Sequence, residues 1–106
     1  MNKENNNMPN YSYKDIANYF IKKHKKDNEP ITPMQLQKLV YFANGIYLAL
    51  YNKPLIKEKF EAWRYGVVVN QLFQDLKSYG GNGVVNTIQT NNSSLKFTED
   101  SDKILN

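Results

Sequence analysis

The segment that most constrains the fold runs from Thr32 to Tyr51 and has the pattern of one long apolar helix. Thr32 suits the N-cap, Pro33 the first helical position, and Gln35 the third residue of a capping box. The main apolar stripe at helical spacing is Leu36, Leu39, Val40, Ala43, Tyr47 and Leu50, widened by Phe42, Ile46 and Ala49.

Little of this segment remains polar enough to face water. The polar strip that is left is Gln37, Lys38, Tyr41 and Asn44. A helix that is apolar over most of its girth is covered by neighbours on several sides, which predicts that this helix is central. Gly45 in its middle costs roughly 1 kcal/mol relative to alanine, and we expect another element to approach closely there.

Two further helices are predicted on either side of the central one in the sequence. The first runs from about Ser12 to Lys26, where Ser12 and Asp15 form a capping box in outline. Its apolar stripe is Tyr13, Ile16, Ala17, Phe20 and His24. The later helix runs from about Val69 or Asn70 to Tyr79 and ends at Gly80 and Gly81. Its predicted buried stripe is Val69, Leu72, Phe73, Leu76 and Tyr79.

The remaining segments are short. A short extended piece is expected around Phe60 to Tyr65. Residues 84–90 and 95–98 are strand candidates joined by a polar turn, which predicts a hairpin. From Thr98 the pattern starts a C-terminal helix that we expect to be incomplete, with Ile104 and Leu105 as its first core contacts.

A chain of 106 residues is long enough for one domain. We expect residues 1–11 to be a disordered, Asn-rich lead and residues 12–106 to form that domain. The predicted fold class is α+β and predominantly α. A central buried helix is packed by two further helices, with a small antiparallel hairpin or sheet.

Composition excludes several classes of function. The chain has no cysteine, so disulfides, thiolate metal sites and a cysteine nucleophile are absent. No apolar run is long enough to span a membrane and no secretory signal begins the chain, so we expect a cytoplasmic protein. We expect no cofactor.

Catalytic residues are not apparent. His24 is the single histidine, and its place on an apolar stripe favours a packed or capping role. No GxSxG or P-loop motif occurs, and Glu58 with Glu61 does not guarantee the fixed separation that paired carboxylates need. The acidic residues Glu99, Asp100 and Asp102 are typical of a helix cap rather than a cation site. The sequence therefore indicates a protein that is not an enzyme.

One charged cluster favours an alternative function. Lys22, Lys23, Lys25 and Lys26 lie within five residues of a chain whose net charge is +4. Such a cluster can contact phosphates, and nucleic-acid binding through it would decrease steeply with salt. A solvated helix end is the simpler interpretation.

The stretch FEAWRYGVVVN, residues 60–70, holds the only Trp and the only Arg of the chain. We expect Trp63 to be buried against the central helix and Gly66 to permit the reversal into the last helix. Arg64 and Tyr65 are expected to point outward as partner contacts, because Arg and Tyr are favoured at interface hot spots. Tyr41 and Asn44, on the polar strip of the central helix, are further candidates.

Taken together, these motifs resemble the Panacea domain, the SocA-like family that is also described as GepA-like in phage and mobile-element genomes. The resemblance covers about residues 12 to 105. Its signature residues here are Leu36, Lys38, Leu39, Tyr41, Phe42, Glu61, Trp63, Gly66, Tyr79 and Gly80. The chain departs from the family in having Val67 where a proline usually follows the glycine. The family's domain also continues beyond the point where this chain stops, so the chain resembles a truncated member.

The resemblance implies an antitoxin-type interaction module that binds and neutralises a co-encoded toxin. It also implies that the domain can act as an adaptor that delivers the toxin to a ClpXP-type AAA+ protease. Neither activity requires catalytic residues. Apolar surface that a shortened domain leaves uncovered would be masked by a partner protein or by self-association into a homo-oligomer.

Overall fold

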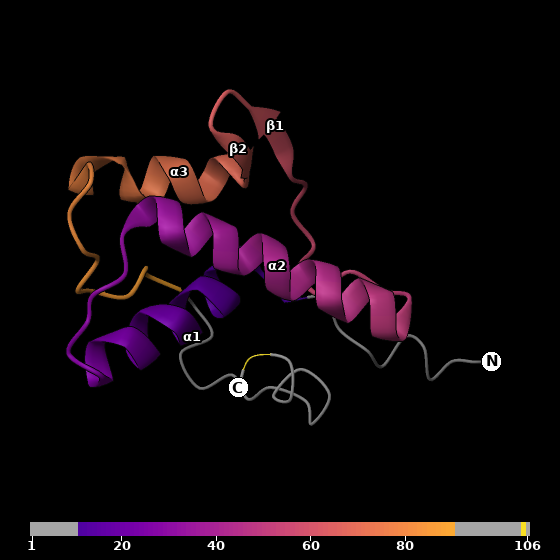
Figure 1. The fold of residues 1–106 in the computed structure, drawn as a ribbon, viewed down its shortest axis with the longest axis horizontal. Coiled ribbons are helices and arrows are strands. Elements are labelled where there is room, and N and C mark those ends of the chain that lie inside the picture. The colour runs from indigo at the N-terminus through magenta and orange to yellow at the C-terminus, as the bar shows by residue number, and fades with distance from the viewer. Residues whose placement is uncertain (1–10, 91–104, 106) are drawn as a thin grey trace.

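The computed structural model describes residues 11–90 and residue 105 (Figure 1). Its elements are α1 (Tyr13–Lys26), α2 (Pro33–Tyr51), β1 (Glu61–Trp63), β2 (Gly66–Val68), α3 (Asn70–Leu76) and the short 3-10 turn η2 (Lys77–Tyr79). Helices dominate these described residues and the two strands form one antiparallel sheet, so the predicted α+β class with mainly helical content is confirmed.

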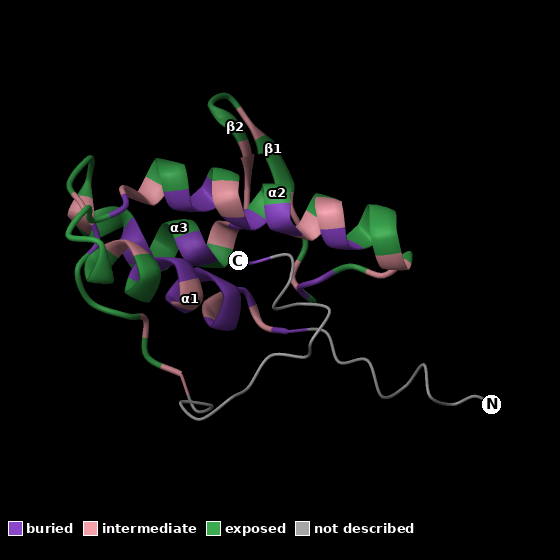
Figure 2. Ribbon diagram, turned by 60° about the horizontal axis from the view of Figure 1, so that its bottom comes forward, coloured by how far each residue is buried: buried purple, intermediate pink, exposed green. Residues whose placement is uncertain are grey.

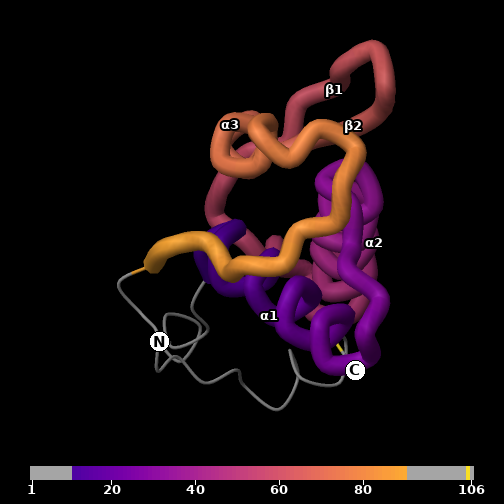
Figure 3. The backbone as a smooth tube through the Cα atoms, turned by 90° about the vertical axis from the view of Figure 1, so that its left-hand side faces the viewer, coloured from indigo at the N-terminus to yellow at the C-terminus, as the bar shows by residue number. Residues whose placement is uncertain are grey.

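Helix α2 lies between the other two helices (Figure 1). It contacts α1 on one side and both α3 and β2 on the other. Figure 3 looks nearly along α2 and shows the chain after α3 returning past α2 toward α1. The central position predicted for this helix is therefore confirmed.

Both long helices begin as their sequences predict. Ser12 caps α1 and forms a complete capping box with Asp15. Thr32 caps α2 in the same way with Gln35, and Pro33 occupies the first helical position. The His24 ring lies in the last turn of α1 with Nδ1 3.0 Å from the carbonyl oxygen of Phe20, which fits the expected packed or capping role.

The core joins residues from every part of the described chain. Most of the predicted core residues are buried: Ile16, Phe20, Leu36, Val40, Ala43, Tyr47, Leu72 and Leu76. Others come from segments that the sequence did not mark as core, namely Tyr11, Ile31, Leu55, Ile56 and Val84. Leu39 is only half-buried, and the prediction that Phe73 is buried is wrong, because 41% of its surface is exposed.

Helix α2 is less completely covered than its apolar composition predicts. Phe42 and Leu50 are 65% and 62% exposed, and Figure 2 shows exposed residues along α2 beside the buried ones. The expected close approach at Gly45 is also wrong, since an added Cβ there would meet no atom within 4 Å.

Side-chain amides of the helices hold the irregular segments in place. The buried amide of Gln37 donates to the carbonyl of Val69 at 3.0 Å and accepts from the amide nitrogen of Val69 at 2.9 Å. The prediction that Gln37 faces water is therefore wrong. Asn44 is half-buried rather than exposed, and its oxygen accepts from the backbone nitrogens of Leu55 at 2.7 Å and Ile56 at 3.2 Å.

Asn18 of α1 makes a third contact of this kind. Its side-chain nitrogen donates to the carbonyl of Ile88 at 2.8 Å, and its oxygen accepts from the backbone nitrogen of Ile88 at 2.7 Å. A side-chain amide thus satisfies the donor and the acceptor of one residue, as a neighbouring strand would. Because an unpaired buried backbone group costs about 1–3 kcal/mol, these contacts allow non-helical chain to pack against the helices.

The segment after η2 is not the strand that was predicted for residues 84–90. Within it Val84 alone forms an isolated antiparallel bridge, and its partner is Ile31. The proposed partner strand, residues 95–98, and the start of the C-terminal helix at Thr98 lie outside the described residues. Leu105 is described, and its burial in the core was expected.

The start of α1 is held by residues from two distant segments. Glu58 accepts a hydrogen bond from the backbone nitrogen of Tyr13 at 2.8 Å and a longer one from the hydroxyl of Ser12. The Tyr13 hydroxyl donates to the carboxylate of Asp75 in α3. Burial is the main cause that raises the pKa of Tyr13 well above its ordinary value, and the Asp75 carboxylate adds to it.

This raised pKa predicts a loss of stability in alkali. The folded-state pKa lies above the unfolded one, so the stabilisation is complete below about pH 10, the ordinary tyrosine pKa. It decreases as pH rises further, by about 1.4 kcal/mol per pH unit. We expect the Tyr13→Phe variant to lack this loss when the free energy of unfolding is measured with urea above pH 10. Parallel stability profiles for the two proteins above pH 10 would contradict it.

The surroundings of Gly45 and Gly83 differ, so substitution of each by alanine should change stability in opposite directions. Gly45→Ala should stabilise the fold by about 1 kcal/mol, because the helix gains propensity and the new methyl group meets no atom. Gly83→Ala should destabilise it by about 1–3 kcal/mol, because its Cβ would lie 2.5 Å from the Cβ of Pro30. Denaturation midpoints of the two variants check the signs, and equal shifts would refute the packing described here.

Truncation of Gln37 tests the helix-to-loop amide contacts. We expect Gln37→Ala to lower the free energy of unfolding by about 1–3 kcal/mol, because the buried Val69 nitrogen loses its acceptor, whereas the Val69 carbonyl keeps the backbone nitrogen of Phe73 as a donor. Gln71→Ala, at an exposed position of α3, is the matched control and should change it by less than about 0.5 kcal/mol. Similar losses in both variants would contradict this role.

Candidate functional site

The hairpin formed by β1 and β2 projects beyond the three helices (Figure 1). Its strands pair Glu61 with Val68, Ala62 with Val67 and Trp63 with Gly66. The two residues of the turn are Arg64 and Tyr65, and both are exposed, as expected. Gly66 has a φ of 128°, which glycine adopts at little steric cost. Gly66 therefore permits the reversal inside the hairpin, and the expected reversal into α3 at this residue is wrong.

Trp63 is half-buried and lies on the hairpin, outside the buried core. Its indole nitrogen donates to Glu61 at 2.9 Å, and its ring packs edge-on against Phe73 with centroids 5.0 Å apart. The prediction of a Trp63 buried against the central helix is therefore wrong. The hairpin carries the indole to the side of α3, where Phe73 supplies its aromatic neighbour.

A hollow of about 200 Å³, called the hairpin cavity below, lies between the hairpin, α3 and the beginning of α2. It is lined by Pro33, Met34, Gln37, Lys38, Trp63, Tyr65, Gly66, Val67, Val68, Leu72, Phe73, Leu76 and Gly80. Met34, Tyr65 and Phe73 in this lining are 52%, 72% and 41% exposed. The cavity is therefore apolar inside and bordered by apolar side chains that remain in contact with water.

The structure brings several of the predicted partner-contact residues to this side of the molecule. Tyr65 lines the cavity and Arg64 precedes it in the same turn. Tyr41 is 48% exposed and packs edge-on against Phe60, just before β1, with centroids 5.1 Å apart. Asn44 does not join them as an exposed group, because its oxygen holds the chain at residues 55–56.

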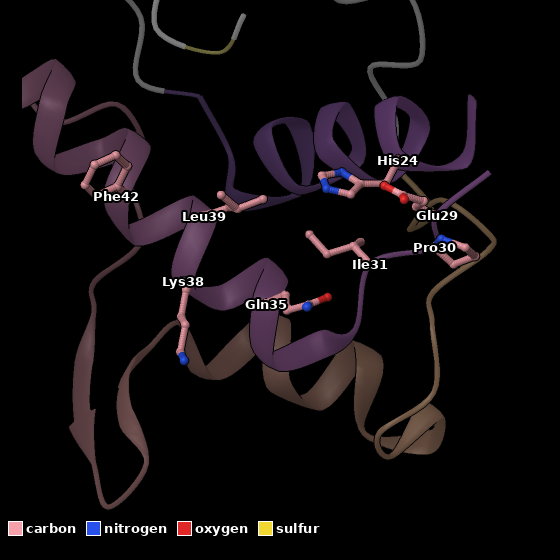
Figure 4. Close-up of a pocket in the computed structure, with 8 residues that line it drawn as sticks. All are labelled: His24, Glu29, Pro30, Ile31, Gln35, Lys38, Leu39 and Phe42. Carbon is pink, nitrogen blue, oxygen red and sulfur yellow. The ribbon is translucent and has the colours of Figure 1, made fainter. Parts of the chain in front are cut away.

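A second and more open hollow, of about 820 Å³, lies between the end of α1 and α2 and is called the α1–α2 groove (Figure 4). The side chains of His24, Ile31 and Leu39 converge there, while Lys38 extends away from them. Glu29, Pro30, Gln35 and Phe42 complete its lining. Lys38 therefore borders both hollows.

Some of the family signature residues are buried or half-buried, and the others are exposed to water. Leu36 is buried, and Leu39, Trp63 and Tyr79 are half-buried. Those exposed to water are Lys38, Tyr41, Phe42, Glu61, Gly66 and Gly80. Gly80 has a φ of 59° at the end of η2, as expected for a glycine that ends a helical segment.

Among the residues that line the hairpin cavity, sequence reasoning named Tyr65 alone as a partner contact, and it missed the exposed border residues Met34 and Phe73. Met34 and Phe73 are apolar residues on helices, so periodicity gives no sign that either remains partly exposed. The nearest signal is the position of Met34, one residue after the proline that opens α2, where few neighbours cover a helix.

The described residues offer little for other chemistry. Residues 11–90 and 105 contain no cluster of three histidine or acidic side chains that could hold a metal ion. In the same part of the chain, no helix has the length and apolar character needed to cross a membrane. The side chains of Lys22, Lys23, Lys25 and Lys26 are exposed at the end of α1.

Comparison with known proteins identifies the family. Residues 36–106 match the family described as "Antitoxin SocA-like, Panacea domain", so the chain belongs to it. The curated protein "Antitoxin SocA" of Caulobacter vibrioides (strain NA1000 / CB15N) is 34% identical over 71 residues. That alignment covers 67% of this chain and 38% of the relative, so the chain spans well under half of the relative's length. No solved structure matches the chain.

Proposed function

We propose that this chain is an antitoxin module that binds a cognate toxin in the cytoplasm and neutralises it, without catalysing a reaction. Membership of the SocA-like antitoxin family is the observation that carries this proposal. The matched residues include α2, the hairpin and α3. The matched region thus includes most of the lining of the hairpin cavity, although Pro33 and Met34 precede it.

The contact surface in this proposal is the hairpin side of α2. Arg64 and Tyr65 at the turn and Tyr41 on α2 present a cation and two aromatic rings to solvent. Tyr, Trp and Arg are enriched among the few residues that dominate the binding energy of protein interfaces. Aromatic rings bury much area with little loss of conformational entropy. A solvent-exposed hairpin turn of this kind also leaves the core intact when it binds.

One finer role belongs to this proposal, and one alternative function stands beside it. The domain would act as an adaptor for a ClpXP-type AAA+ protease if it held the toxin and the protease together. The alternative of nucleic-acid binding rests on the exposed lysines of α1, and it predicts affinity that decreases steeply with salt.

Co-expression with the product of the adjacent gene tests the antitoxin proposal. We expect the chain to restore growth and to co-purify with that product. Tyr65→Ala should weaken the complex by about 2 kcal/mol, or roughly 30-fold, because it removes an exposed interface ring. Titration calorimetry measures this change. Val85→Ala, at another partly exposed apolar residue, is the matched control and should bind like the wild type.

Different failures point to different conclusions. Absence of a complex with the adjacent gene product would contradict the antitoxin role. Equal weakening by Tyr65→Ala and Val85→Ala would contradict the hairpin as the contact surface but would leave the antitoxin role standing. Growth rescue that disappears in cells without the protease would support the adaptor role over direct neutralisation.

A further inference from the structure

We propose that the hairpin cavity is a socket for one large apolar side chain, presented by an acidic segment of the partner protein. The inference rests on the proposed function in taking that partner to be the toxin. It goes beyond that function by naming the cavity that receives a side chain of the partner and the kind of segment that carries this side chain.

The size of the cavity selects a single side chain as its occupant. Sites for small molecules and cofactors usually measure roughly 300–1,000 Å³. The hairpin cavity, at about 200 Å³, is smaller than that range. Its lining is mainly apolar, and the edge-on pair of Trp63 and Phe73 forms one wall. A pocket of this size and lining fits an aromatic or large aliphatic residue.

The residues at the border of the cavity favour an occupant from another protein. Met34, Tyr65 and Phe73 all line the cavity and all keep 41% or more of their surface exposed. Burial of these three side chains around an inserted anchor would remove water from both partners. Interface hot spots have this arrangement, in which a filled apolar pocket is surrounded by contacts that exclude water.

The charges around the cavity determine the chemistry of the partner segment. Lys38 is the charged residue among the described residues that line it. Arg64 adds a second exposed cation beside Tyr65, whereas the carboxylate of Glu61 accepts the hydrogen bond of the Trp63 indole. Carboxylates next to the anchor residue would therefore meet positive charge, which favours correct partners and speeds their encounter.

The same charges disfavour a second copy of this chain as the occupant. The chain has a net charge of +4, and self-association through this surface would bring the Lys38 and Arg64 side chains of two copies together. Like charges at an interface oppose association. An acidic segment from a different protein has no such penalty.

Short peptides test the socket without the toxin. The probes are the capped tripeptides Asp-Phe-Asp, Asp-Gly-Asp and Lys-Phe-Lys, titrated into the full chain. Trp63 is the only tryptophan and lines the cavity, so its fluorescence reports occupancy. We expect saturable binding of Asp-Phe-Asp with a Kd of about 1 mM, and at least tenfold weaker binding of the other two peptides.

Two variants make the test decisive. Val67→Phe fills the cavity from β2 and should abolish the response to Asp-Phe-Asp. Lys38→Glu changes an exposed side chain without risk to the core. It should weaken Asp-Phe-Asp and strengthen Lys-Phe-Lys, each by about tenfold. Val85→Phe, outside the cavity lining, is the control and should respond like the wild type.

The outcomes separate the socket from the antitoxin role. No saturable response to Asp-Phe-Asp, an equal response to all three peptides, or an undiminished response in Val67→Phe would overturn the socket. If the adjacent gene product still bound the chain in any of these cases, the antitoxin role would stand. A clear peptide response with no binding of that product would refute the antitoxin role instead.

Discussion

The amide of Gln37 lies buried between α2 and the start of α3, where it pairs with both polar groups of the Val69 backbone. This contact fixes the exit of the hairpin against the central helix, and much of the candidate site depends on it. Asn44 and Asn18 hold residues 55–56 and 88 by the same chemistry. Because regular strands are short in this fold, helix side chains satisfy backbone groups that a larger sheet would pair.

The site follows from this arrangement. The hairpin leaves the helical layer, and its two-residue turn displays Arg64 and Tyr65. Its base remains attached to α2 through Val69, next to the cavity between the hairpin and α3. A binding surface built on an anchored turn keeps its shape before the partner arrives, which reduces the entropy lost on binding. That property suits the antitoxin role proposed above.

The sequence predicted the features that depend on neighbouring residues and missed those that depend on contacts between distant residues. The two capping boxes, the limits of α2 and its central position followed from residues a few places apart. The roles of Gln37 and Asn44 could not be predicted, because a polar residue on an apolar helix looks the same whether it meets water or a distant backbone. Trp63 was misplaced for a related reason: composition favours burial of an indole, but the hairpin register decides which side of α3 it reaches.

Hydrogen exchange of individual backbone amides, measured by NMR in the native protein, tests the central claim most directly. The nitrogens of Leu55, Val69 and Ile88 lie outside helices and strands but donate to helix side-chain amides. We predict that they exchange as slowly as the helical amides of α2, because their release requires opening of the core. Exchange as fast as that of the exposed turn at Tyr65 would contradict the account.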